Sequence, residues 1–212
     1  MKRAGPTQNA TAGIVLLHGR GGSATDILSL MSHAALPEVA AIAPEAPGNS
    51  WWPTSFLAPS AQMEPFVTAA LAQVEDAIAT LTAEGIPAGS IWLAGFSQGA
   101  CLAAEAYARH GKALAGLMAF SGALVGTADA EGPPSVALYG HAPKRFDYTG
   151  HRKGRVWLSV HERDPHIPLA RVQETATTLT ALGAAVETKL YPGAGHGVMR
   201  DDIAALQRLL AS

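Results

Sequence analysis

Short apolar runs bounded by glycine and proline alternate along the chain with longer segments whose apolar residues recur at helical spacing. Apolar runs of about four to eight residues are typical of buried strands, whereas longer segments with a period near 3.6 are typical of helices. This alternation predicts an α/β fold with a mainly parallel sheet. The predicted strands span residues 13–18, 39–43, 90–94, 114–120, 156–161 and 186–191.

Four segments have the pattern of helices. In residues 66–81, 169–179 and 203–210 the apolar side chains fall on one face, as expected for helices that cover a sheet. The segment that starts at Ala100 differs, because small residues occupy every face and favour close packing in the interior. Gly111 is its expected end.

A chain of 212 residues is expected to form one compact domain over residues 1–212. The least regular segments are residues 44–59 and 121–154, and neither is long enough for a second domain or a large lid domain. Long loops within a compact domain are often functional. We therefore expect Phe146 and Tyr148, in the second of them, to form a small flap.

The composition narrows the class of protein. Hydrophobic residues make up 48% and charged residues 15%, with a net charge of -2, so neither disorder nor a footprint for nucleic acid is expected. No apolar stretch is long enough for stable membrane insertion. The basic start is followed by Gly5 and Pro6 rather than by the apolar core of a signal peptide. With a single cysteine, Cys101, a cytoplasmic location is the expectation.

The strongest chemical signal is Gly95-Phe96-Ser97-Gln98-Gly99, which follows a predicted strand and precedes the small-sided helix. In that context a G-x-S-x-G turn exposes the serine hydroxyl above a sheet, and glycines flank it because side chains there would meet neighbouring backbone. The motif predicts Ser97 as a nucleophile. The alternative is an ordinary tight turn with a capping serine.

A serine nucleophile needs a histidine to take its proton and an acid to orient that histidine, in the chain order Ser, acid, His. His196 lies in a glycine-rich loop after the last predicted strand, and Asp164 follows the strand 156–161. These two are the predicted base and acid. Glu162 is the alternative acid and His166 the alternative base.

Acyl transfer also needs N–H donors aimed at a developing oxyanion. Gln98 follows the nucleophile and supplies the first backbone N–H. The loop after the first predicted strand supplies the second, which we assign to the backbone N–H of Arg20. The Arg20 side chain is expected to be solvated or to contact an acidic part of a substrate.

The same loop supports a different hypothesis. Residues 19–24 match the dinucleotide fingerprint G-x-G-x-x-G/A after a strand, and Glu45 lies about 20 residues further on, as that motif requires. Such a module would leave Ser97, Asp164 and His196 without a role. It therefore stays a remote alternative.

An aromatic cluster precedes the first long helix. We predict that Trp51, Trp52, Phe56 and Leu57 form part of an apolar wall for the substrate, since ester sites are usually apolar with a few polar groups. The alternative is that these side chains anchor the loop in the core.

The chain resembles the phospholipase/carboxylesterase family of α/β-hydrolases, which includes bacterial carboxylesterases and acyl-protein thioesterases. The resemblance implies a single-domain α/β-hydrolase fold, triad roles for Ser97, Asp164 and His196, and oxyanion roles for the backbones of Arg20 and Gln98. His161 departs from the family, which usually has a small residue there. The segments that carry the resemblance are Leu16-Leu17-His18-Gly19, Gly95-Phe96-Ser97-Gln98-Gly99-Ala100, Asp164-Pro165-His166-Ile167-Pro168 and Tyr191-Pro192-Gly193-Ala194-Gly195-His196.

These observations predict a serine carboxylesterase that hydrolyses small or short-chain esters through an acyl-Ser97 intermediate, with no cofactor and no metal. A thioesterase or a lysophospholipase would use the same triad. A non-catalytic ligand receptor on the same fold is a further alternative. The expected partner is a small-molecule ester, with no nucleic acid.

Overall fold

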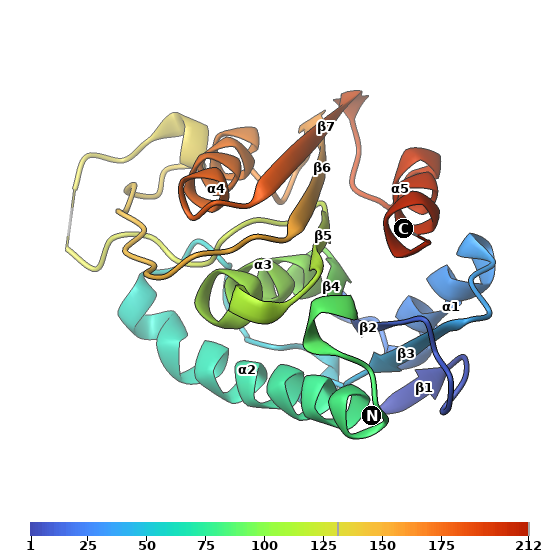
Figure 1. The fold of residues 1–212 in the computed structure, drawn as a ribbon. Helices are drawn as coiled ribbons and strands as arrows, with labels where there is room; N and C mark the ends of the chain where they lie inside the picture. The colour runs from blue at the N-terminus through green and yellow to red at the C-terminus, as the bar shows by residue number, and fades with distance from the viewer. Residues whose placement is uncertain (131, 212) are drawn as a thin grey trace.

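The computed structural model describes residues 1–130 and 132–211, which form three layers, a seven-stranded sheet between two layers of helices (Figure 1). The strand order is β1-β3-β2-β4-β5-β6-β7. Only β1 is antiparallel to its neighbour among the paired strands described. The strands are β1 (Lys2–Ala4), β2 (Ala12–Leu17), β3 (Val39–Ala43), β4 (Ile91–Phe96), β5 (Gly116–Phe120), β6 (Arg155–Arg163) and β7 (Ala185–Ala194).

Helices cover both faces of the sheet, which is why its central strands are apolar throughout. Helices α2, α3 and α4 pack on one face, and α1 and α5 on the other (Figure 1). The helices are α1 (Ala24–Ala34), α2 (Ser60–Ala83), α3 (Gln98–His110), α4 (Leu169–Ala181) and α5 (Arg200–Leu210). Short 3₁₀ turns lie at η1 (Pro47–Asn49), η2 (Ala88–Ser90), η3 (Gly111–Ala113) and η4 (Val136–Leu138).

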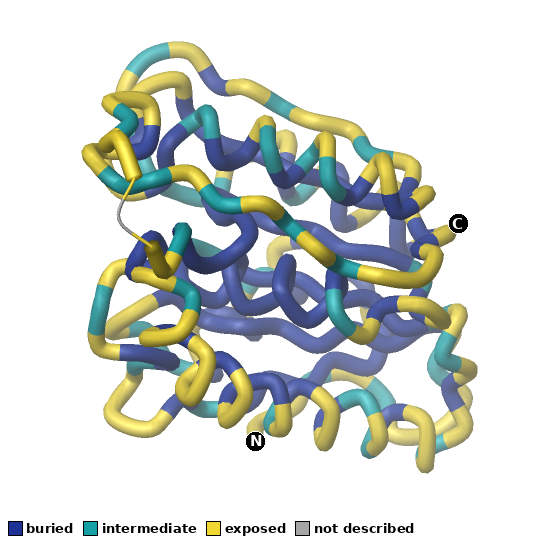
Figure 2. The backbone as a smooth tube through the Cα atoms, turned by 90° about the vertical axis from the view of Figure 1, so that its left-hand side faces the viewer, coloured by how far each residue is buried: buried dark blue, intermediate teal, exposed yellow. Residues whose placement is uncertain are grey.

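Helix α3 lies in the interior, against the centre of the sheet (Figure 2). It is buried from Gln98 to Ala108, as its small side chains predict. Gly99 allows this close approach, because a Cβ atom there would lie 2.1 Å from the carbonyl oxygen of Leu17. The small-sided segment of the sequence is therefore the helix that sits directly on β2 and β4.

The α/β class and the mainly parallel sheet confirm the prediction from the sequence. Two elements were not predicted, β1 and α1. Strand β1 has three residues and no apolar run. The sequence does contain a start signal for helix α1, a capping box between Ser23 and Asp26. This signal overlaps the glycine-rich loop, which was interpreted as an oxyanion site or a dinucleotide site. Helix α2 begins at Ser60, earlier than predicted, directly after Pro59.

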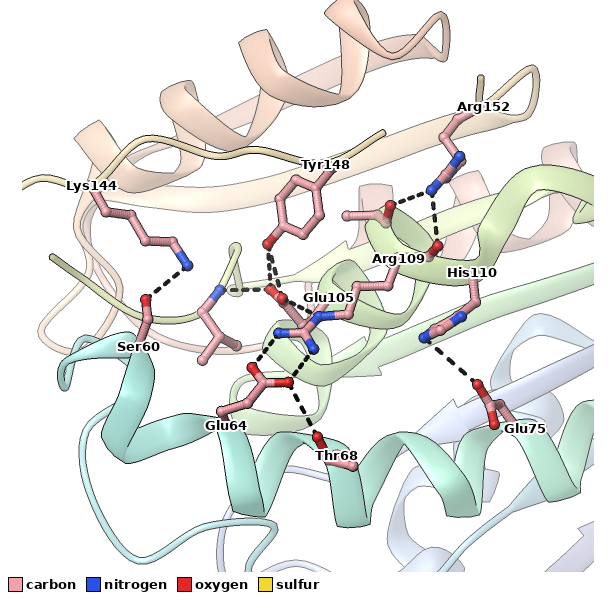
Figure 3. Close-up of polar contacts among 12 residues, drawn as sticks. Ser60, Glu64, Thr68, Glu75, Glu105, Arg109, His110, Lys144, Tyr148 and Arg152 are labelled. Carbon is pink, nitrogen blue, oxygen red and sulfur yellow. Dashed lines mark hydrogen bonds and ion pairs between the residues drawn. The ribbon is translucent and has the colours of Figure 1, made fainter. Parts of the chain in front are cut away.

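The irregular segment between β5 and β6 is tied to α2 and α3 by a cluster of polar contacts (Figure 3). Lys144 donates to Ser60 Oγ at 3.1 Å, and Tyr148 donates to the Glu105 carboxylate at 2.8 Å. Arg152 donates to backbone carbonyls at the end of α3, including Tyr107 at 3.0 Å. These bonds hold a segment that lacks regular secondary structure over most of its length.

Across the described part of the chain, no helix combines the length and the apolar character needed to cross a bilayer.

Candidate active site

Ser97 occupies the sharp turn between β4 and α3. Its backbone angles are φ 55° and ψ -120°, a left-handed conformation that is strained for a residue with a Cβ atom. The turn is held by the Ser97 N–H, which donates to the Phe120 carbonyl at 2.9 Å. No side chain fits at position 95, because a Cβ atom on Gly95 would lie 2.4 Å from the Gly99 carbonyl oxygen. This geometry is the sharp turn between a strand and a helix that the G-x-S-x-G motif predicts.

His196 lies between Ser97 and Asp164. Its Nε2 atom is 2.8 Å from Ser97 Oγ, and its Nδ1 atom is 2.8 Å from Asp164 Oδ2. The carboxylate accepts a hydrogen from Nδ1, which leaves Nε2 free to accept the serine proton. The structure therefore brings together the three residues that the sequence singled out, from the ends of β4, β6 and β7.

The Asp164 carboxylate is buried behind His196 and has further donors. Oδ1 accepts the backbone N–H of His166 at 2.9 Å and that of Ile167 at 3.0 Å. Burial raises the pKa of Asp164, but the hydrogen bonds from His196 and from these two backbone groups outweigh it, so the pKa lies below its ordinary value. Asp164 is thus held as a carboxylate beside the histidine.

The alternative acid and base lie elsewhere. Glu162 is exposed and accepts the Gly193 N–H at 3.0 Å, so it stabilises the turn that leads to His196. His166 is also exposed, and its ring meets the ring of His196 edge-on, with centroids 4.9 Å apart. Neither side chain is hydrogen-bonded to Ser97 among the contacts described.

His161 packs directly beneath the loop that carries His196. A Cβ atom on Gly195 would lie 2.6 Å from His161 Nε2, so the large ring at one position requires glycine at the other. The His161 ring also contacts Tyr191, with centroids 5.3 Å apart. His161 therefore packs against the loop that positions His196.

Of the two residues whose backbone groups are assigned to an oxyanion, Gln98 directly follows Ser97 in the chain and Arg20 lines the same cavity. The Gln98 N–H is the first of α3, where helical N–H groups have no intrahelical partner. Arg20 is in the loop after β2. This loop is held by the Gly21 N–H, which donates to the Asn49 carbonyl at 2.7 Å.

His18, which was not predicted as a functional residue, also holds the loop after β2. His18 Nδ1 donates to the Gly19 carbonyl at 2.8 Å, and its Nε2 accepts the Ala46 N–H at 3.1 Å.

The side chains of Arg20 and Gln98 have a second effect that the sequence did not predict. Gln98 accepts the Trp51 N–H at 2.9 Å and donates to the Trp52 carbonyl at 2.8 Å. Arg20 donates to the Pro53 carbonyl at 2.9 Å and to the Thr54 carbonyl. Both residues therefore fix the backbone of residues 51–54 against the nucleophile turn.

A cavity of about 530 Å³ opens above Ser97 and His196. Trp52 and Phe56 line it, together with Phe96 and Ile167. Of the four residues predicted as an apolar wall, the structure places two at the cavity.

Trp51 and Leu57 do not line the cavity. Trp51 donates from Nε1 to the His18 carbonyl at 2.9 Å and is buried, and Leu57 is 2% exposed within the core. Phe146 and Tyr148 do not line it either. They pack against each other and line a separate cavity beside Glu105, so the predicted flap is wrong.

Cys101 borders the same cavity but is fully buried. Burial raises the pKa of its thiol to about 12, so it is protonated at neutral pH. Cys101 is a small buried side chain in α3 rather than a reactive thiol.

The start of α1 does not suit a dinucleotide. The N–H groups at its N-terminus donate to acidic side chains. The Ala24 N–H donates to Glu45 Oε2 at 3.2 Å, and the Ser23 N–H donates to Asp26 Oδ2 at 2.9 Å. A pyrophosphate would have to displace two carboxylates there. Glu45 caps a helix in this fold instead of binding a ribose.

Comparison with known proteins gives consistent results. A family model described as Phospholipase/Carboxylesterase matches residues 4–212. The structure of a phospholipase/carboxylesterase from Dyadobacter fermentans DSM 18053 is 39% identical, with a TM-score of 0.85 over 100% of this chain and 95% of that one. The Bacillus cereus carboxylesterase, at 17% identity, shares the fold with a TM-score of 0.72 over 99% of this chain and 92% of that one.

Proposed function

Since the chain belongs to the phospholipase/carboxylesterase family of α/β-hydrolases, we propose that it is a serine carboxylesterase that hydrolyses small or short-chain acyl esters. The observation that carries the proposal is the continuous path of hydrogen bonds from Ser97 through His196 to Asp164. Each contact is 2.8 Å long, within the range that proton transfer requires.

In the proposed mechanism, Ser97 Oγ attacks the ester carbonyl while His196 Nε2 takes its proton. The Asp164 carboxylate stabilises the imidazolium that forms. The tetrahedral intermediate collapses when His196 returns the proton to the alcohol oxygen, which leaves an acyl-Ser97 ester. Water then attacks this ester by the same steps, with His196 as the base, and releases the acid.

The negative charge on the carbonyl oxygen would be met by the backbone N–H groups of Gln98 and Arg20. Fixed donors of this kind usually contribute about 10²- to 10³-fold in kcat each. The side-chain bonds of both residues to segment 51–54 support such a role, because they limit the freedom of the two backbone groups.

The size and lining of the cavity support a small substrate. Its volume of about 530 Å³ lies within the range of sites for small molecules, and aromatic side chains line one wall. Thioester hydrolysis and lysophospholipid hydrolysis would use the same steps. A non-catalytic receptor would have no need of a strained serine aligned with a histidine.

The test is labelling with a fluorophosphonate, which reacts with an activated serine. We expect labelling of the wild type and none of Ser97→Ala. Ser55→Ala is the matched control, because Ser55 lines the same cavity and should leave labelling intact. A folded wild type that resists the reagent would contradict the proposal.

A panel of p-nitrophenyl esters then tests the size of the acyl group. We expect kcat/KM to be highest for acetate to butyrate and to fall for long chains. Faster hydrolysis of long-chain esters than of butyrate would favour the lysophospholipase alternative.

A further inference from the structure

The cavity has two chemically different sides. His196 must protonate the leaving oxygen, so the alcohol part of an ester lies toward His196 and His166. The acyl part then points away from these two rings, toward the rest of the lining, which includes Arg20 and residues 52–56. The groups on this second side decide which acyl chains fit.

The cavity has basic side chains on its lining, of which the arginine carries a permanent charge. Arg20, His166 and His196 line it, and the described lining residues include no aspartate or glutamate. Asp164 lies behind His196, with its side chain fully buried. Since the whole chain has a net charge of -2, this basic character is a property of the cavity and not of the protein as a whole.

The guanidinium of Arg20 is fixed in place but its charge is not neutralised. Its bonds to the Pro53 and Thr54 carbonyls hold it on the wall of the cavity. None of the ion pairs in the described part of the chain includes Arg20. A guanidinium has five N–H donors, and two carbonyls leave several of them for a ligand.

From this arrangement we infer that Arg20 binds a carboxylate at the far end of the acyl group, so that the preferred substrates are half-esters of short dicarboxylic acids. The inference rests on the proposed esterase function and adds its substrate class. A fixed guanidinium suits a carboxylate because it offers paired donors and loses little freedom on binding. Arg20 and Ser97 line the same cavity, so an acid that reaches from one to the other has a short chain.

Two substrates that differ only in charge test the inference. Monoethyl succinate carries a carboxylate, and ethyl succinamate replaces it with a neutral amide of the same shape. Hydrogen bonds to charged groups predict that the wild type prefers the acid by about tenfold or more in kcat/KM. The preference should weaken as NaCl is raised, because salt screens the pair.

The variant Arg20→Gln separates binding of the carboxylate from support of the loop. Glutamine can still donate to a carbonyl, but it has no charge. We expect the ratio of kcat/KM for acid over amide to fall to about one in Arg20→Gln, whatever happens to the rate with the amide. Arg145→Gln is the control, since Arg145 is exposed beside the separate cavity at Glu105, and it should keep the wild-type ratio.

Two results would overturn the inference. The first is a wild type that does not prefer the acid. The second is an Arg20→Gln enzyme in which both rates fall together at an unchanged ratio, because a residue that only supports the loop would behave in that way. Both leave the esterase function standing as long as ethyl succinamate or p-nitrophenyl acetate is hydrolysed and the fluorophosphonate labels Ser97. Failure of labelling and of all hydrolysis would instead contradict the proposed function.

Discussion

Asp164 and Glu105 are both buried carboxylates, 2% and 1% exposed, but their partners differ. Asp164 is hydrogen-bonded to a histidine that borders an open cavity. Glu105 accepts Arg109 Nε at 2.8 Å, the Tyr148 hydroxyl at 2.8 Å and the Val125 N–H at 3.2 Å (Figure 3).

The difference lies in whether the partner can give up its proton. A guanidinium stays charged at any pH at which the protein is folded, so the pair of Glu105 and Arg109 is a permanent structural contact. Arg109 also binds Glu64 on α2 at 2.6 Å, which connects two helices. An imidazole can gain and lose a proton near neutral pH. In the proposed mechanism the carboxylate of Asp164 thus supports proton transfer, whereas that of Glu105 supports a loop.

The largest expected effect is on catalysis. We expect Asp164→Asn to lower kcat for p-nitrophenyl acetate by about 10⁴-fold, because the amide favours the wrong tautomer of the histidine. Glu105→Gln should change kcat by less than about twofold if the protein is assayed below its unfolding temperature, since Glu105 is outside the cavity at Ser97. Equal losses in the two variants would remove the distinction between the two carboxylates.

The next effect is on stability. Glu105→Gln should lower the free energy of unfolding by about 3 kcal/mol, because it breaks a buried ion pair, and lower the Tm by about 6–12 °C. Glu64→Gln is the control at the other end of Arg109, where half of the side chain is exposed, and should cost at most about 1 kcal/mol. Calorimetry of the two variants measures both values. A smaller loss for Glu105→Gln than for Glu64→Gln would contradict the structural role of the buried pair.

Each carboxylate has a tyrosine nearby, and these allow a finer comparison. Tyr148→Phe removes a hydroxyl donor to Glu105 and should cost about 2 kcal/mol of stability without changing kcat. The Tyr139 hydroxyl donates to the backbone carbonyl of Asp164, so Tyr139→Phe should lower kcat with little loss of stability. Urea unfolding measures the stability of both variants, and steady-state kinetics measures their kcat. The reverse pattern would show that the loop at Asp164 needs no such support.

The smallest effect concerns pH. The pKa of Asp164 lies below its ordinary value in the folded protein, so its carboxylate contributes stability above about pH 4. This contribution is lost as the pH falls through the lower, folded value. The difference in unfolding free energy between wild type and Asp164→Asn should therefore narrow by about 1 kcal/mol or less from pH 6 to pH 3. Asp147→Asn, at an exposed position, is the control. A difference in unfolding free energy between wild type and Asp164→Asn that grows toward acid pH would contradict the predicted direction.

The fold was predictable because its signals are local. Apolar runs such as residues 39–43 need a sheet covered on both faces, and the motif around Ser97 fixes its own turn. The positions of Asp164 and His196 followed from the order of the strand ends. Helix α1 was not predicted, because its capping box follows a glycine-rich loop that also fits an oxyanion site or a dinucleotide site.

The walls of the cavity were harder to predict. Trp51 and Trp52 are neighbours that are both buried in the core, yet of the two Trp52 borders the cavity at Ser97 and Trp51 does not. A loop has no hydrophobic periodicity, so the sequence does not show which of the two tryptophans borders the cavity. Glu105 had only one signal, a single acid in a helix of small residues, and its partners Arg109 and Tyr148 become neighbours only through the fold.

The bonds that Gln98 and Arg20 make to segment 51–54 reach only its main chain. Gln98 and Arg20 hold the N–H of Trp51 and the carbonyls of Trp52, Pro53 and Thr54, and none of these contacts depends on a side chain of the segment. The bonds from Arg20 therefore do not depend on which side chains stand at positions 53 and 54. In the proposed esterase, substitutions at these two positions would change the wall of the cavity while leaving the contacts among Ser97, His196 and Asp164 in place.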